Sequence, residues 1–172
     1  MIDPVKDAQW GLLELQEWTW ICETVSKPPW GDTLVIGCGN GHGAIEAVLR
    51  GQPYGFLWCV DNWAERPENC ALFGSFVANH SQHDRVKFYE MDSDTFFRSV
   101  LDPEHKFAFV FVDGDHAYSQ ALRDFANAWE HILPGGVVAG HDFFLESVQK
   151  AGKETGVMRD APHSIRYGRC PR

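Results

Sequence analysis

The 172-residue sequence lacks several features, and each absence excludes a class of protein. No apolar run approaches the roughly 18 residues that a membrane helix needs. The five cysteines are odd in number, irregularly spaced and without a Cys-x-x-Cys pair, which argues against a disulfide framework or a structural zinc site. The first residues have no basic-then-apolar signal pattern, because Asp3, Lys6 and Asp7 interrupt them, so we expect a cytoplasmic protein.

Basic residues are also scarce. The chain has 15 lysines and arginines against 24 acidic residues, for a formal net charge of -9. Because Lys and Arg supply much of the affinity for phosphate backbones, this balance disfavours nucleic-acid partners and CoA-like substrates. The length and the apolar fraction of 44% predict one globular domain, residues 1–172, with a sizeable core.

Short apolar segments alternate with segments of helical periodicity. Strands are predicted at 33–36, 56–60, 86–91, 107–112 and 137–139, with a last one at 164–169, and a strongly amphipathic helical pattern covers 118–133. This alternation predicts an α/β fold, a Rossmann-like, doubly wound and mostly parallel sheet of six or seven strands with helices on both faces.

An N-terminal helical extension is predicted within residues 1–30. The helical pattern covers residues 8–26 and ends at Lys27-Pro28-Pro29, since proline removes a backbone donor. The nearby Trp20 and Trp30 indicate that this helix packs on the domain or on another subunit, so a homodimer is one candidate assembly.

A glycine-rich segment, GCGNGHG, joins the strand at 33–36 to the helix after it. Glycines there let the backbone turn sharply and a ligand approach closely, and the helix N-terminus offers unpaired N–H groups. Asp61 ends the next strand, where a carboxylate can accept hydrogen bonds from both hydroxyls of a ribose. Gly39, Gly41 and Ala44 also fit the G-x-G-x-x-A pattern of nicotinamide-dependent dehydrogenases, so the loop alone leaves the cofactor open.

Polar clusters follow two later strands. Asp113, Asp115 and His116 come after the strand at 107–112, and His141 and Asp142 come after the strand at 137–139. The carboxyl ends of adjacent parallel strands meet at one edge, so we expect these side chains to converge there. A dehydrogenase has no comparable need for such clusters, and the Tyr-x-x-x-Lys proton-donor pattern is absent.

The segments GCGNGHG, CVDNW, MDSD, FVDGDHAY and PGGVVAGHDF occur in this order, and with them residues 31–143 resemble class I S-adenosylmethionine-dependent methyltransferases. The sequence looks like methyltransferase family 24, related to catechol and caffeoyl-CoA O-methyltransferases. The resemblance implies O-methylation of a small hydroxylated substrate. It also implies a set of cofactor-binding residues: Gly37, Cys38, Gly39, Asn40, Gly41, Asp61, Asn62, Trp63, Asp92, Ser93 and Asp113.

Within that set, the resemblance gives each group a part of the cofactor. The loop glycines would pass along the methionine part, Asp61 would take the ribose hydroxyls, and Asp92 with Ser93 would face the adenine. The relatives usually carry an acid two residues before the first loop glycine, where this chain has Val35.

The resemblance further implies a divalent metal site and a catalytic base. Asp113, His141 and Asp142 stand where metal-dependent relatives place their ligands, although the relatives have an acid at the position of His141. Imidazole suits Mn²⁺, Fe²⁺ or Zn²⁺ better than Mg²⁺ or Ca²⁺, so either His141 is not a ligand or the ion is not simply Mg²⁺. His116 stands where catechol-type enzymes have a lysine base, and its ordinary pKa of about 6.5 suits proton abstraction from a hydroxyl. Asp113 would act with it in catalysis.

The same residues also fit two other functions. A nicotinamide-dependent oxidoreductase and a non-catalytic cofactor-binding module are the alternatives, the latter because the short chain leaves little room for a substrate lid. Asp115 is also a candidate helix N-cap, and Trp63 and Tyr118 are candidates for packing. Residues 1–30 and 143–172 are expected to bind the methyl acceptor.

Overall fold

The computed structural model describes residues 13–171. The helices are α2 (Leu15–Val25), α3 (Ala44–Gly51), α4 (Glu68–Asn79), the 3-10 helix η1 (His83–Arg85), α5 (Ser93–Ser99), α6 (Tyr118–Glu130) and α7 (Glu146–Thr155). The strands are β1 (Thr33–Ile36), β2 (Leu57–Asp61), β3 (Val86–Glu90), β4 (Phe107–Val112), β5 (Ile132–Gly140), β6 (Arg159–Asp160) and β7 (Arg166–Arg169).

The strands form one sheet in the order β3-β2-β1-β4-β5-β7-β6. Strands β1 to β5 pair in parallel, while β7 runs antiparallel to β5 and β6 runs antiparallel to β7. The order reverses at β1 and β4, and this is where a doubly wound sheet opens a crevice at the carboxyl ends of its strands. The predicted α/β class and the mostly parallel sheet are confirmed.

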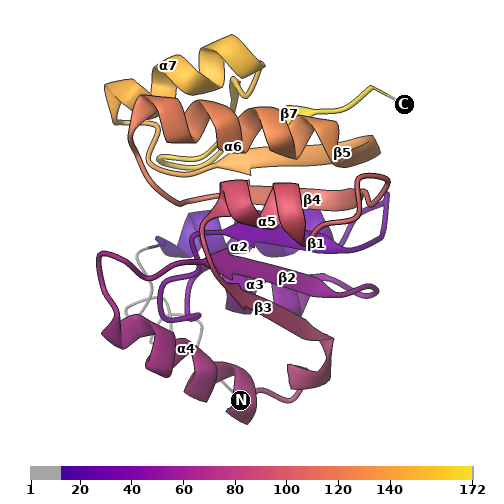
Figure 1. Cartoon of the computed structure of the whole chain (residues 1–172). Helices are drawn as coiled ribbons and strands as arrows, with labels where there is room; N and C mark the ends of the chain where they lie inside the picture. The colour runs from indigo at the N-terminus through magenta and orange to yellow at the C-terminus, as the bar shows by residue number, and fades with distance from the viewer. Residues whose placement is uncertain (1–12, 172) are drawn as a thin grey trace.

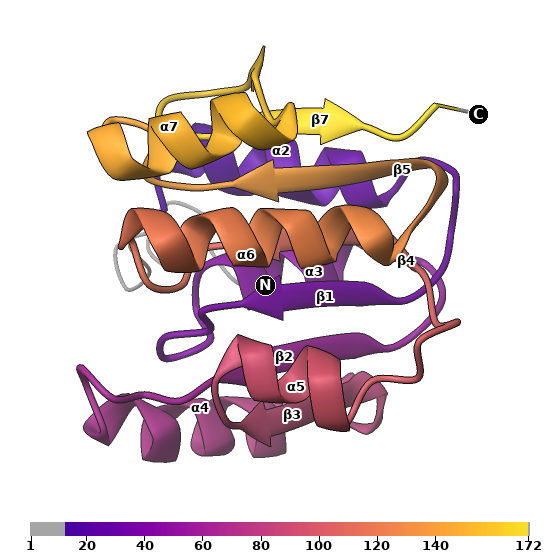
Figure 2. The same cartoon turned by 45° about the horizontal axis from the view of Figure 1, so that its top comes forward.

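Helices cover both faces of the sheet (Figure 1). In Figure 2, α5, α6 and α7 lie in front of the sheet, and α2 and α3 lie behind it. Strand β1 shows why two cores form: Leu34 and Ile36 belong to the apolar cluster under α5, α6 and α7, whereas Val35 belongs to the cluster under α2, α3 and α4. Val35 is fully buried, so an apolar residue suits this position in the present chain.

Two predicted boundaries differ from the structure. Helix α6 ends at Glu130, and Ile132 already pairs with Phe107 of β4, so β5 includes the Pro-Gly-Gly segment that the sequence marks as a turn. The pairing register shifts between Phe107 and Phe109, which lets the strand absorb this segment as an irregularity.

The N-terminal helix is also shorter than predicted. Among the described residues, α2 begins at Leu15, with Glu14 as its N-cap residue. The predicted start at residue 8, and Trp10 with it, lie outside the described residues. Trp20 of this helix packs on Phe109 and Tyr167, so α2 covers the sheet.

The loops that follow β1, β4 and β5 are hydrogen-bonded side by side. The amide of Asp113 donates to the carbonyl of Ile36, and the amide of His141 donates to the carbonyl of Val112. Polar residues after three neighbouring strands are thereby brought to one edge of the sheet. Within residues 13–171, every helix is too short or too polar to span a bilayer.

Candidate functional site

An open, continuous cavity of about 1210 Å³ runs along the carboxyl ends of the strands. One end is lined by the glycine loop and the ends of β2 and β3, and the other by the loops after β4 and β5 together with the start of α2 and the segment before β7. Predicted site residues that line it are Gly37, Cys38, Gly39, Asn40, Asp61, Asn62, Trp63, Asp92, Ser93, Asp113, Asp115, His116, His141 and Asp142.

The glycine loop depends on glycine at its first position. Gly37 has φ +83°, and a Cβ there would lie 1.9 Å from the carbonyl oxygen of Asp113. Only a residue without a side chain lets the loop after β1 lie against the end of β4. Gly41 differs, because it is not among the described residues that line the cavity, and a Cβ there would meet the ring of Phe76 in α4 at 2.6 Å. Gly41 thus packs closely against α4, and its contact with the cofactor stays a prediction.

Asp61, the predicted ribose-binding acid, organises the glycine loop. Its Oδ2 accepts hydrogen bonds from the amides of Cys38 at 2.7 Å and Gly39 at 3.1 Å, and its Oδ1 accepts one from the amide of Trp63 at 2.7 Å. The side chain still lines the cavity, as does the neighbouring Asn62. This carboxylate thus joins the end of β2 to the loop after β1.

Trp63 also holds the glycine loop near the end of β2. It is buried, packs on Phe73 and donates from Nε1 to the carbonyl of Gly39 at 2.7 Å. Its φ of +46° is uncommon for a bulky residue, and such backbone conformations cluster at functional sites. The packing role expected for Trp63 is present, and it serves to hold the glycine loop in place.

The end of β3 leads into a buried polar network. Asp92 caps α5 by accepting a hydrogen bond from the amide of Thr95 at 2.8 Å. The hydroxyl of Ser93 donates to Asp124 Oδ1 at 2.6 Å, and Gln120 Nε2 donates to both Ser93 Oγ and Asp124 Oδ1 at 3.0 Å. Ser93, Gln120 and Asp124 all line the cavity at its glycine-loop end.

Asp124 is a site residue that the sequence analysis missed. It is 1% exposed on α6, and burial raises its pKa to about 6 even though hydrogen bonds from Ser93 and Gln120 oppose the shift. The available signal was weak: an acid lies next to Phe125 on the apolar face of a strongly amphipathic helix.

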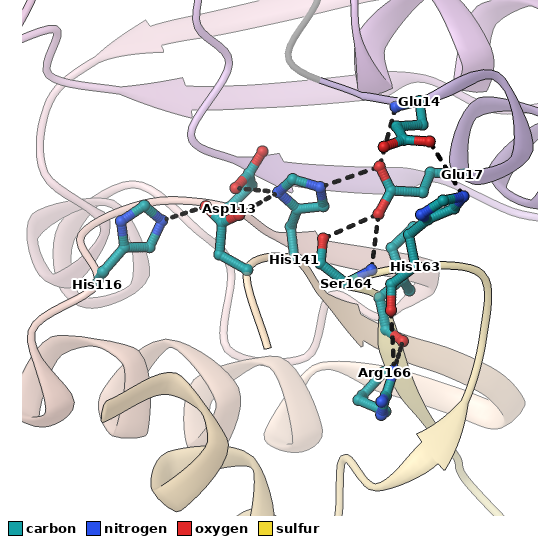
Figure 3. Close-up of polar contacts among 10 residues, drawn as sticks. Glu14, Glu17, Asp113, His116, His141, His163, Ser164 and Arg166 are labelled. Atoms are coloured by element: carbon teal, nitrogen blue, oxygen red, sulfur yellow. Dashed lines mark hydrogen bonds and ion pairs between the residues drawn. The ribbon is translucent and has the colours of Figure 1, made fainter. Parts of the chain in front are cut away.

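The other end of the cavity holds a cluster of charges around His141. The ring of this residue, 6% exposed, points Nδ1 at Asp113 Oδ1 (3.3 Å) and Asp142 Oδ1 (3.1 Å), while Nε2 faces Glu17 Oε2 at 3.2 Å. Figure 3 shows the ring between Asp113 on one side and Glu17 on the other. Burial lowers the pKa of His141, but hydrogen bonds to the three carboxylates outweigh burial and raise it to about 12.

Glu17 is the second site residue that the sequence analysis missed. It lies in the first turn of α2 and is 2% exposed. Burial raises its pKa, but hydrogen bonds from His141, from the Glu14 amide and from Ser164 lower it to about 2. The sequence signal for Glu17 was the Glu14-x-x-Glu17 spacing, which resembles a capping box at a helix start. The predicted helix start at residue 8 placed this spacing inside the helix, so the signal was missed.

His116, the predicted base, lies on the loop before α6. Its Nε2 is 2.9 Å from Asp142 Oδ2, and 45% of its side chain is exposed. A hydrogen bond to Asp113, together with the negative charges of Asp142 and Asp113, raises the pKa of His116 above its ordinary value. The histidine is therefore a stronger base than a free imidazole and stays protonated to a higher pH.

Two further residues near this loop have structural contacts. Asp115 Oδ1 accepts a hydrogen bond from the amide of Ala117 at 2.8 Å, in the turn before α6, whereas the N-cap position belongs to Ala117. The N-cap interpretation of Asp115 is therefore wrong by two residues. Tyr118 donates to Glu154 of α7 at 2.7 Å, which agrees with a packing role.

The donor set around His141 fits a divalent metal ion. Asp113, His141 and Asp142 each offer one ligand atom, and these atoms lie within 4.8 Å of one another. Two carboxylates and one imidazole suit Mn²⁺, Fe²⁺ or Zn²⁺. In the metal-free protein the carboxylates hold His141 as an imidazolium, so a metal ion would have to displace the Nδ1 proton.

Many solved structures share this fold, among them three methyltransferases from bacteria. The O-methyltransferase TomG from Streptomyces achromogenes, involved in tomaymycin synthesis and in complex with SAM, has a TM-score of 0.71 and 15% identity over 89% of this chain and 74% of its own. An O-methyltransferase from Bacillus cereus in complex with SAH has a TM-score of 0.69 and 17% identity over 91% and 76%. The N-methyltransferase NodS from Bradyrhizobium japonicum WM9 has a TM-score of 0.60 and 14% identity over 90% and 94%.

The sequence itself also matches a known family. No curated protein matches the chain significantly. The model of methyltransferase family 24, described as a methyltransferase domain, matches residues 34–143, which is more than half of the chain. This range contains the glycine loop, Asp61 and Asp113, and it ends just after Asp142. The chain therefore belongs to methyltransferase family 24 and is an S-adenosylmethionine-dependent methyltransferase with the class I fold.

Proposed function

We propose that the protein methylates a hydroxyl group of a small molecule, with a divalent metal ion at the acceptor. The observation that carries this proposal is the cavity that joins the glycine loop to the Asp113–His141–Asp142 cluster. A methyl donor and an acceptor must meet in line, and a continuous cavity between two differently built ends permits this. Similar structures named as O-methyltransferases support the hydroxyl acceptor, although one named as an N-methyltransferase shares the fold.

The glycine-loop end suits the cofactor. Gly37 and Gly39 would lie along its methionine part and Asp61 with Asn62 beside its ribose, while Asp92 with Ser93 would face the adenine. S-adenosylmethionine supplies an activated methyl group bonded to a positively charged sulfur. The acids at this end can hold hydroxyls, and the buried Trp63 fixes the loop that carries the glycines.

The His141 end suits the acceptor hydroxyl. Asp113, His141 and Asp142 would hold a divalent ion, which lowers the pKa of a bound hydroxyl and orients it. His116, beside Asp142, would take the proton that the hydroxyl loses. The rate should increase with pH as the His116 ring loses its proton, because only the neutral imidazole can accept the proton of the hydroxyl.

We also propose that the whole chain acts as one methyltransferase domain. Segments outside the matched range line the same cavity, among them Leu13 and Glu17 before it and His163, Ser164 and Arg166 after it. The acceptor would therefore be chosen by these segments, as expected for residues 1–30 and 143–172. The exposed ring of Phe144, next to the metal-binding pair, offers an apolar surface for a ring-bearing acceptor.

Calorimetry and turnover test this proposal. Calorimetric titration should show binding of S-adenosylhomocysteine and none of NAD. Methyl transfer to a panel of catechols and other small hydroxylated compounds should then fall about 10²–10⁴-fold in His116→Ala and in Asp113→Asn. Asp84→Asn is the control, because it makes the same chemical change at an exposed acid of η1 that does not line the cavity. Unchanged turnover in both test variants would disprove the roles of His116 and Asp113, and binding without any transfer would favour a non-catalytic module.

A further inference from the structure

Both carboxylate oxygens of Glu17 have hydrogen-bond partners inside the cavity. Its Oε2 accepts a hydrogen bond from the Glu14 amide at 3.0 Å and faces His141 Nε2 at 3.2 Å. Its Oε1 accepts hydrogen bonds from the amide and hydroxyl of Ser164 at 3.0 and 2.9 Å. Both oxygens are thus fixed from two directions, by α2 and by the segment that leads into β7.

This anchoring decides how the His141 ring presents its two nitrogens. A carboxylate only accepts hydrogen bonds, so the Nε2 that faces Glu17 must carry a hydrogen. Nδ1 is then the nitrogen on the opposite side of the ring, where oxygens of Asp113 and Asp142 lie at 3.3 and 3.1 Å. Burial of both His141 and Glu17 leaves the ring little freedom to turn.

We propose that Glu17 is a positioning residue, which directs His141 Nδ1 to a divalent cation shared with Asp113 and Asp142. The inference rests on the metal-assisted function proposed above. Metal-binding histidines usually donate their second ring N–H to a carboxylate, which fixes the tautomer and strengthens the ligand. Glu17 stands in that relation to His141.

The same geometry selects the class of cation. One imidazole nitrogen with two carboxylate oxygens is a donor set for Mn²⁺, Fe²⁺, Co²⁺ or Zn²⁺, whereas Mg²⁺ and Ca²⁺ prefer oxygen ligands alone. An imidazole binds a metal ion through only one of its two nitrogens, so His141 needs a partner that fixes which nitrogen faces the ion. A carboxylate at this position would need no such partner. Glu17 and Ser164 lie outside the family match at 34–143, so this chain uses its own flanking segments to orient a ligand inside the matched range.

The test is a Mn²⁺ titration followed by electron paramagnetic resonance, with wild-type protein, three single variants and one double variant. Glu17→Gln keeps the size of the side chain and removes its charge, and it should weaken Mn²⁺ binding about 10–100-fold. Ser164→Ala is the control, since it removes one contact of Glu17 and leaves the contact with His141, and its affinity should stay within about twofold of wild type. His141→Asp should bind Mg²⁺ better than wild type does, and adding Glu17→Gln to it should have little further effect because no imidazole remains to be positioned.

A second measurement needs no substitution. In the Zn²⁺-loaded wild-type protein, the ¹⁵N NMR signals of His141 should identify Nε2 as the protonated nitrogen and Nδ1 as the metal-bound one. Equal Mn²⁺ affinity in wild type and Glu17→Gln, or the opposite nitrogen on Zn²⁺, would overturn the inference. Failure of the wild type to bind Mn²⁺, Co²⁺ or Zn²⁺ would also overturn it, and His141 would then act as a permanent imidazolium. Methyl transfer by chelator-treated protein, measured separately, shows whether the methyltransferase assignment survives such a result.

Discussion

Two buried carboxylates line the same cavity, and their pKa values are shifted in opposite directions from those of free carboxylic acids. Glu17, at the His141 end, has a pKa lowered to about 2, whereas Asp124, at the glycine-loop end, has a pKa raised to about 6. Both are almost fully buried, at 2% and 1% exposure. Burial raises the pKa of each acid, so burial cannot explain the difference.

The difference comes from the partners. Glu17 faces an imidazolium, whereas Asp124 has a hydroxyl and a carboxamide as hydrogen-bond donors. A positive charge stabilises a buried carboxylate far more than neutral donors do. The His141 end of the cavity therefore holds paired charges, which the proposed site for a metal ion and an ionising hydroxyl would require. The other end holds an acid that loses its charge in mildly acidic solution.

Removing Glu17, the acid of the His141 end, should have the largest effect on stability. Glu17→Ala leaves a buried cation with one partner fewer and should lower the free energy of unfolding by about 3–5 kcal/mol. Urea denaturation at pH 7 measures this. Glu23→Ala, which changes an exposed acid of the same helix, should alter stability by less than about 0.5 kcal/mol. Equal losses in the two variants would remove the distinction between a paired buried acid and a surface one.

Replacing Asp124, the acid of the glycine-loop end, should change the free energy of unfolding in the opposite direction. The folded-state pKa of Asp124 is raised, so its contribution to stability is fully present below about pH 3.8 and is lost as the pH rises through about 6. The loss is about 3 kcal/mol, at 1.36 kcal/mol for each pKa unit. Asp124→Asn can still accept both hydrogen bonds and has no charge to desolvate. It should therefore be more stable than wild type at pH 7 by up to about 3 kcal/mol and nearly equal to it at pH 3.5.

Denaturation curves of wild type and Asp124→Asn from pH 3.5 to 7 provide the measurement. The difference in unfolding free energy should grow with pH. For Glu17 the sign is reversed, because a lowered pKa contributes stability above about pH 4.5 that is lost as the pH falls toward about 2. A constant difference between wild type and Asp124→Asn across the range would contradict the raised pKa.

Removing a neutral hydrogen-bond donor of Asp124 should have the smallest effect on stability. Ser93→Ala removes the hydroxyl that donates to Asp124 at 2.6 Å, and should cost about 1–2 kcal/mol at pH 7. It should also move the pH dependence assigned to Asp124 to higher pH, since one of the two hydrogen bonds that oppose burial is lost. A shift to lower pH would mean that the Ser93 hydroxyl does not stabilise the charged form.

Much of this site could be predicted from strand ends. Asp61 ends a strand, and Asp113 and the pair His141-Asp142 follow two others. A parallel sheet brings such residues to one edge whatever the details of packing. The glycine loop is recognisable from its closely spaced glycines. Gly37 is needed there because any side chain would collide with the backbone of Asp113. The fold class followed from the same alternation of strands and helices.

The two residues that decide the charge of the cavity could not be predicted. Glu17 meets His141 across 124 positions of sequence, and nothing local to α2 indicates that contact. Asp124 lies on a helical face whose other buried residues are apolar, so the pattern suggests a core. The start of β5 was missed for a related reason: the pairing of Ile132 with Phe107 overrides the turn preference of the Pro-Gly-Gly segment.

We infer above all that one cavity holds the cofactor at its glycine-loop end and the acceptor at its His141 end. A crystal structure with bound S-adenosylhomocysteine tests it most directly. The adenine should lie beside Asp92 and Ser93, the ribose beside Asp61, and the sulfur should point toward Asp113. A ligand bound outside this cavity, or one whose adenine lies against His141, would contradict the claim.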